Sequence, residues 1–187
     1  MPNWTQNRIL IPVNKKADFI RKFTVGIKHG KSPRLRQFDF NRVLRQPNDL
    51  LQGDLTTQQI RENPHNWNTW NRNNWGSKWS ACDSDYKLHT SGEFEGLFEI
   101  IFTTANGYAS QALVSKICER LKCEVQHIFY SEEDDVAGWD AYEFNRDECK
   151  IYIAEESDSD ELRERLKELF GCWGYEDVEE SEDTKET

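Results

Sequence analysis

Several features that mark common protein classes are missing from this sequence of 187 residues. No apolar run is long enough to span a membrane, and the first residues lack the basic and then apolar order of a secretory signal. The sequence has no phosphate-binding glycine loop, dinucleotide-binding fingerprint, metalloprotease helix or nucleophile elbow. These absences predict a cytoplasmic protein that does not enter a membrane and is not an enzyme.

Cysteine and histidine are scarce, at five and four residues. An odd number of cysteines without a secretory signal predicts free thiols. One short stretch gathers metal-ligand types but lacks the paired cysteine spacing of zinc and iron–sulfur sites: Cys82, Asp83, Asp85 and His89. His127 lies between apolar residues of a predicted strand, which is typical of a buried histidine with hydrogen-bond partners. We therefore expect no metal ion and no cofactor.

Charges of the two signs are separated along the chain. The net charge is −10, yet residues 1–54 hold 11 basic and 4 acidic side chains, whereas residues 55–187 hold 13 and 30. The basic run before Asp39 can neutralise phosphates, and it is equally typical of a solvated helix followed by a basic loop. Four successive carboxylates stand out in the acidic part: Glu132, Glu133, Asp134 and Asp135. They repel duplex DNA and can occupy a phosphate-binding surface by mimicking its charge, although acidity also simply keeps a protein soluble.

The hydrophobic pattern predicts an alternation of strands and helices. Apolar spacing indicates helices over residues 15–27 and 113–121, and a final helix that Asp158 caps and Gly171 ends. Alternating apolar residues indicate strands, which lie at residues 7–13, 78–86, 94–102, 124–130, 139–144 and 150–154. This order predicts an α+β fold, with helices packed on one face of a mostly antiparallel sheet.

One domain is expected over residues 1–173, because a chain of this length commonly forms a single domain and no internal repeat is present. An insertion over about residues 34–77 is expected to interrupt it, and between residues 56 and 76 six asparagines interleave with three tryptophans. Residues 174–187 hold seven acidic side chains and few apolar ones, which predicts an acidic flexible tail.

The tryptophans Trp75 and Trp79 are four residues apart, so they share a face on a helix and also on a strand. Burial in the core, with the indole N–H groups satisfied, is one interpretation. The other is a platform on which bases or a partner's side chains stack, with Arg72 and Lys78 supplying charge. On this second interpretation Arg72, Trp75, Lys78 and Trp79 are the candidate recognition residues.

A longer pattern surrounds these residues. The string Asn74-Trp75-Gly76-Ser77-Lys78-Trp79-Ser80-Ala81, with Met1-Pro2-Asn3-Trp4 and with Phe40-Asn41 followed by Pro47, resembles the Api92-like, or YubB-type, proteins of plasmids and phages. The resemblance implies a ferredoxin-like domain without an iron–sulfur cluster, and an origin on a mobile element. Members of that family generally have no established activity. Their first residues often read Asn-Trp-Cys, whereas this chain has Asn3-Trp4-Thr5.

Two functional hypotheses follow. The first is a non-enzymatic accessory protein of a phage or other mobile element that binds a host protein or protein–nucleic-acid complex in the bacterial cytoplasm. Such a protein would inhibit a host defence or nucleic-acid-handling complex, with Glu132, Glu133, Asp134 and Asp135 as a nucleic-acid-mimicking interface. The alternative is a nucleic-acid-binding module that uses the basic N-terminal segment and a Trp-rich stacking surface.

Overall fold

A computed structural model describes residues 2–27, 35–131, 136–145 and 148–156. Its main sheet has six strands in the order β4-β5-β1-β6-β7-β8, and every neighbouring pair is antiparallel. The strands are β1 (Trp4–Pro12), β4 (Cys82–Leu88), β5 (Leu97–Ala105), β6 (Val125–Ser131), β7 (Val136–Asn145) and β8 (Glu148–Glu156). No helix among the described residues has both the length and the apolar character needed to cross a membrane.

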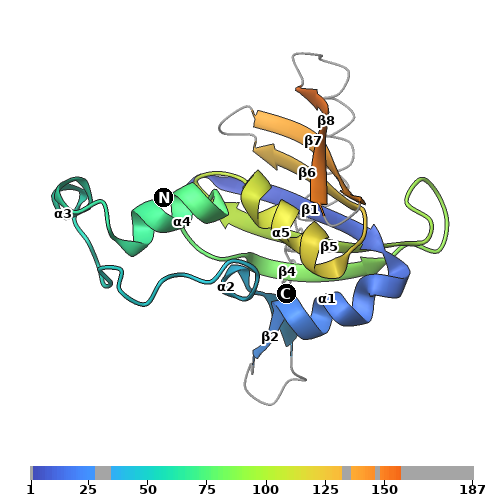
Figure 1. The fold of residues 1–187 in the computed structure, drawn as a ribbon, viewed down its shortest axis with the longest axis horizontal. Helices are drawn as coiled ribbons and strands as arrows, with labels where there is room; N and C mark the ends of the chain where they lie inside the picture. The colour runs from blue at the N-terminus through green and yellow to red at the C-terminus, as the bar shows by residue number, and fades with distance from the viewer. Residues whose placement is uncertain (1, 28–34, 132–135, 146–147, 157–187) are drawn as a thin grey trace, which may run out of the picture.

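Two helices complete the central unit, α1 (Lys16–Phe23) and α5 (Gln111–Leu121). The chain runs β1-α1-β4-β5-α5-β6, and these four strands stand in the order β4-β5-β1-β6. This is the β-α-β-β-α-β arrangement of ferredoxin-like folds. The predicted α+β fold with a mostly antiparallel sheet is confirmed, and β7 and β8 extend the sheet beyond β6 (Figure 1).

The segment between α1 and β4 includes residues 34–77, over which the sequence predicts an insertion. After α1 come the small antiparallel pair β2 (Thr24–Ile27) and β3 (Leu35–Phe38), and then the helices α2 (Phe40–Val43), α3 (Thr57–Glu62) and α4 (Trp67–Trp75). Figure 1 shows α3 and α4 extending to one side of the sheet, away from α1. A short 3-10 turn, Val13–Lys15, joins β1 to α1.

The predicted helix over residues 15–27 is too long, because α1 ends at Phe23. Thr24 adopts an extended conformation, and its hydroxyl donates to the Ile20 carbonyl across 2.6 Å. The extended chain then pairs with β3, with Thr24 opposite Phe38. Pairing with the next strand, β3, therefore overrides helical spacing at this point.

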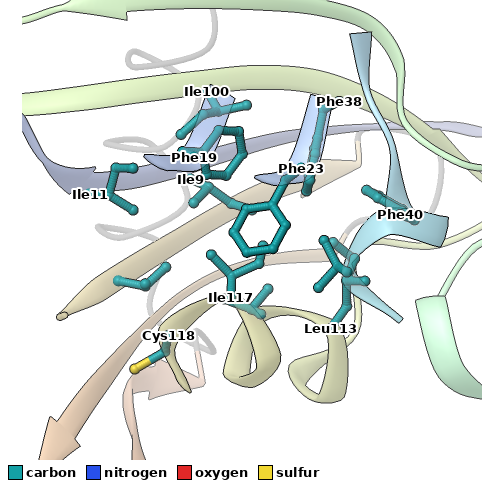
Figure 2. Packing of buried hydrophobic residues seen from close by; sticks show 14 of the residues in the cluster. Ile9, Ile11, Phe19, Phe23, Phe38, Phe40, Ile100, Leu113, Ile117 and Cys118 are labelled. Atoms are coloured by element: carbon teal, nitrogen blue, oxygen red, sulfur yellow. The ribbon is translucent and has the colours of Figure 1, made fainter. Parts of the chain in front are cut away.

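The main core lies between one face of the sheet and the two helices. Figure 2 shows Phe19 and Phe23 of α1 lying between Ile9 and Ile100 of the central strands and Ile117 of α5. All five side chains are fully buried. The segment between α1 and β4 joins this core through aromatic contacts, because the Phe38 ring packs on Phe19 and Phe102, and Phe40 packs on Trp75. Residues of this segment are thus held by the same apolar burial that holds the sheet.

The opposite face of the sheet is also buried at its centre. Phe94, from the loop between β4 and β5, packs with Leu10 and Ile128. Beside them Arg8 and Glu99 form an ion pair with 3.2 Å between Nη1 and Oε1, and neither side chain is more than 5% exposed. The sheet centre therefore presents no open face. The predicted final helix and the acidic tail lie outside the described residues.

Candidate binding surface

Helix α4 carries two of the four predicted recognition residues, Arg72 and Trp75, and its two ends are well defined. At the first end, the Asn66 side chain accepts a hydrogen bond from the Thr69 N–H across 2.9 Å, which is the usual role of asparagine before a helix. At the other end, Gly76 adopts a left-handed conformation with φ of 79°. The asparagine-rich segment thus forms a regular helix.

Asparagines on the buried side of α4 hold the chain that follows it. Asn71 is 4% exposed, and its Nδ2 donates to the main-chain oxygen of Lys78 across 2.9 Å. Its Oδ1 accepts from Gln46 Nε2 across 2.8 Å. Both ends of the amide are therefore used, and the backbone at Lys78 is fixed in place.

Trp75 and Trp79 have different environments. Trp75 is 5% exposed, and its indole N–H donates to the Leu44 carbonyl across 3.0 Å. Its ring packs edge-on against Phe40 and Trp70. Trp75 thus belongs to the core, which agrees with the first of the two interpretations above. Trp79 follows the end of α4 and is 38% exposed.

Trp79 lies beside Trp4, the first residue of β1. Their ring centroids are 6.3 Å apart, the planes are tilted by 40°, and Trp4 is 43% exposed. The last residue of β5 brings them together, because Ala105 pairs with Trp4 and its carbonyl accepts from the Lys78 N–H across 3.0 Å. The Lys78 Nζ sits 4.7 Å from the centre of the Trp79 ring. We call Trp4, Lys78 and Trp79 the tryptophan surface.

Sequence reasoning did not assign Trp4 to a site. Two sequence features could have indicated Trp4 as a site residue, because it precedes an alternating strand and is part of the string that carries the family resemblance. Its neighbour, however, follows from the register of β1 on β5, which joins distant parts of the chain. Local spacing contains no information on that register.

A cavity of about 520 Å³ adjoins the tryptophan surface. It lies between α3 with the residues just before it, one side of α4, and Lys78 after α4. Its lining includes Asp54, Trp67, Asn68, Thr69, Arg72 and Lys78, and we call it the Arg72 pocket. Lys78 belongs to both the pocket and the tryptophan surface, so the two are continuous. The structure thus brings Arg72, Lys78 and Trp79 together and leaves Trp75 beneath them.

The basic N-terminal segment lies elsewhere. Lys16, Arg21 and Arg36 line a separate cavity next to Val13, just beyond the last residue of β1. Trp4 is at the opposite end of this nine-residue strand, roughly 26 Å away along its axis. The tryptophan surface and these cations therefore do not form one groove. Residues 28–34 of the basic segment and the carboxylates of residues 132–135 lie outside the described residues.

The half-buried thiols of Cys82 and Cys123 and the fully buried imidazole of His127 favour their neutral forms. Burial lowers the pKa of His127 to about 3, raises the pKa of Cys123 to about 11, and raises the pKa of Cys82, to which the charge of Asp83 adds. Neutral thiols and a neutral buried imidazole are poor nucleophiles and poor proton carriers. Within the described ranges, no group of three or more His, Cys, Asp or Glu side chains is placed to hold a metal ion.

Comparison with known proteins gives one structural similarity. No family model matches the sequence, and no curated protein matches it. The fold is similar to the crystal structure of protein api92 from Yersinia pseudotuberculosis, described with the family model DUF1281. The sequences are 10% identical, the match covers 83% of this chain and 99% of the other, and the TM-score is 0.45.

Proposed function

We propose that this chain is a non-enzymatic accessory protein of a phage or other mobile element that binds a host protein through the tryptophan surface. The observation that supports this proposal is the contact between two exposed tryptophans, Trp4 and Trp79, with Lys78 over one ring. Large aromatic side chains at the centre of an interface contribute much of the binding free energy in protein complexes. Other exposed apolar side chains, such as Val13, Leu88 and Ile151, are on other elements.

A protein partner fits this surface better than a single-stranded nucleic acid. The Lys78 ammonium already lies over the Trp79 ring at 4.7 Å, so a base stacking on that side would have to displace it. The cations of the basic segment are at the other end of β1. The chain has a net charge of −10, which opposes binding of a polyanion.

The test combines two alanine variants with a matched control. Wild type, the double variant Trp4→Ala/Trp79→Ala and the control Leu88→Ala are tagged and used to capture proteins from a bacterial lysate. Leu88 is a suitable control because it is 43% exposed and lies at the far end of β4. Any protein captured by wild type is then purified and titrated against all three by calorimetry.

The expected result is a partner whose dissociation constant rises at least about tenfold in the double variant and stays unchanged in Leu88→Ala. Circular dichroism confirms that both variants are folded. Equal binding by all three forms, or no direct binding of any captured protein, would refute the proposal. A saturable, salt-sensitive quench of tryptophan fluorescence by an oligonucleotide, lost in the double variant, would instead establish the nucleic-acid alternative.

The acidic cluster is a second contact in this proposal. Reversing the charge of Glu132, Glu133, Asp134 and Asp135 to lysine tests it on the same purified partner. If these carboxylates mimic nucleic-acid charge, the reversal weakens binding and reduces its dependence on salt. Unchanged affinity at low and high salt would exclude mimicry and leave the tryptophan surface as the interface.

A further inference from the structure

The side chain of Arg72 is held at its base and free at its tip. Its Nε donates to Asn68 Oδ1 across 3.0 Å, one helical turn earlier on α4. Asn68 is 7% exposed whereas Arg72 is exposed, so the hydrogen bond anchors the guanidinium on its buried side and leaves its outer edge toward the cavity and solvent. Among the described residues, no oxygen accepts a hydrogen bond from the terminal nitrogens of Arg72, and no carboxylate pairs with it.

The charge around the cavity is positive. Arg72 and Lys78 face a single carboxylate, Asp54, among the lining residues. Lys78 has no carboxylate partner among the described residues either. The first turn of α4, from Trp67 to Thr69, forms part of the wall, and the amino end of a nine-residue helix adds a partial positive charge.

The wall that carries Asp54 is tied to the helix. The indole N–H of Trp67 donates to the Gly53 carbonyl across 2.8 Å, and Asp54 is the next residue. The main chain of Leu51 pairs with the strand-like segment before α4, with its N–H donating to His65 O and its carbonyl accepting from Trp67 N–H. These bonds form the cavity before any ligand arrives, so a ligand does not have to order the loop.

We propose that the Arg72 pocket is an oxyanion-binding site that takes a carboxylate or a phosphate group. Arg72 is the anchor, because the free edge of a guanidinium matches two oxygens of such a group. Lys78 adds a second positive charge, and the Thr69 hydroxyl and Asn73 amide are lining donors. The volume of about 520 Å³ is in the range of small-ligand sites. This site does not depend on the protein partner proposed above.

Two small anions test the site without any knowledge of a natural ligand. Inorganic phosphate and glutarate are titrated separately into the nitrogen-15-labelled protein in a phosphate-free buffer of low salt. The readouts are the Nε–H resonance of Arg72 and the indole N–H resonance of Trp67, which both lie at the pocket. Sodium chloride at matched ionic strength is the blank.

The variants are Arg72→Gln, Arg72→Lys and the control Arg61→Gln, which removes an exposed arginine of α3 from outside the pocket lining. For wild type and Arg61→Gln we expect saturable shifts at both groups. Arg72→Gln should bind either anion at least about tenfold more weakly than wild type. Arg72→Lys should have an intermediate affinity, because lysine keeps the positive charge but lacks the two parallel N–H donors of a guanidinium. Tighter binding of phosphate than of glutarate identifies a phosphate ligand, and the reverse order identifies a carboxylate.

Two results would overturn the site: shifts no larger than those with sodium chloride, or equal affinity in wild type and Arg72→Gln. Dispersed spectra show that each variant is folded, and Arg72→Lys keeps the test valid if Arg72→Gln does not fold. The outcome is separate from that of the partner experiment. The variant Trp79→Ala, which should lose the protein partner, is expected to retain phosphate or glutarate binding.

Discussion

Trp75 donates its indole N–H to the main-chain oxygen of Leu44 across 3.0 Å and thereby ties the end of α4 to the residue after α2. Its ring is 5% exposed and fills the space between Phe40 and Trp70. Trp79 lies on the other side of Gly76 and makes its contacts at the surface. The two tryptophans of one short string therefore have separate tasks, one in stability and one in contact with solvent or a partner.

Replacing each tryptophan by phenylalanine should separate these tasks. Trp75→Phe removes the donor to Leu44 and leaves a gap in the core, so the free energy of unfolding should fall by about 2 kcal/mol or more. Trp79→Phe changes an exposed ring and should cost less than about 0.5 kcal/mol. Urea unfolding followed by circular dichroism measures both. Similar losses in the two variants would show that Trp75 is not a core anchor.

Position 76 requires glycine for two reasons, its left-handed φ and the backbone atoms of Tyr108 and Ser110 that lie close to it. Its φ is 79°, and a Cβ placed there would lie 2.8 Å from the Ser110 nitrogen and far too close to the Tyr108 carbonyl. Gly76→Ala should destabilise the protein by about 3 kcal/mol, because strain and a clash with backbone add. Gly53→Ala is the matched control, since Gly53 has φ of 97° with nothing within 4 Å of its Cβ position. It should cost about 1 kcal/mol. Thermal unfolding compares the two, and equal shifts in Tm would contradict the role of the close contact.

The sequence predicted the features that depend on local spacing and missed those that depend on contacts between distant segments of the chain. The order of strands and helices follows from local apolar spacing, and it was sufficient for an α+β fold with a mostly antiparallel sheet, whereas the ferredoxin-like arrangement was implied by the family resemblance. The shared face inferred for Trp75 and Trp79 assumed one regular element through both residues. The left-handed turn at Gly76 breaks that element and turns Trp79 toward Trp4. The pairing of Trp4 with Trp79 needs the β1–β5 register, which local patterns do not contain.

The buried ion pair on the second face of the sheet was also beyond prediction. Arg8 and Glu99 lie on neighbouring central strands. In the sequence, each is a charged residue within an apolar strand, and nothing nearby indicates its partner. Glu99 also accepts from His89, with 2.9 Å between His89 Nε2 and Glu99 Oε2. The carboxylate thus joins two strands and the loop after β4.

Removing one member of the Arg8–Glu99 pair should lower the free energy of unfolding more than replacing both members with apolar residues. Glu99→Gln leaves the Arg8 guanidinium, 4% exposed, without the Glu99 charge and should reduce the free energy of unfolding by about 3–5 kcal/mol. The double variant Arg8→Met/Glu99→Leu fills the same space with apolar groups and should lose less than Glu99→Gln. Urea titrations at pH 7 measure each form. A double variant less stable than Glu99→Gln would show that the pair contributes net stability.

The tautomer of His127 is fixed by Asn7. Asn7 Nδ2 donates to Thr5 O and to Thr104 Oγ1, across 3.0 and 2.8 Å, so its Oδ1 must face the other way. That oxygen accepts from the Ala109 N–H across 3.0 Å and lies 3.1 Å from His127 Nε2. The Nε2 of His127 therefore carries the proton of a neutral, fully buried ring.

This neutral ring makes stability depend on pH. Burial lowers the pKa of His127 to about 3 from its ordinary 6.5, so the unfolded chain binds a proton that the native protein rejects between these values. The contribution of His127 to stability is complete above pH 6.5 and falls as the pH falls toward 3. The residue alone should account for a loss of about 2 kcal/mol in the free energy of unfolding between pH 7 and pH 5.

His127→Gln places an amide donor near the position of Nε2 without a titrating group, so its stability should fall less over the same interval. Asp140 lies opposite His127 on β7, and burial raises the pKa of its carboxyl, which acts in the other direction. Asp140 is present in both proteins, so its effect largely cancels when their pH slopes are subtracted. His65→Gln, which alters a side chain that is 60% exposed, is the control for losing a histidine anywhere. Urea unfolding at half-unit steps from pH 7 to pH 5 gives the slopes, and identical slopes in wild type and His127→Gln would mean that the ring binds a proton as readily in the folded protein as in the unfolded chain.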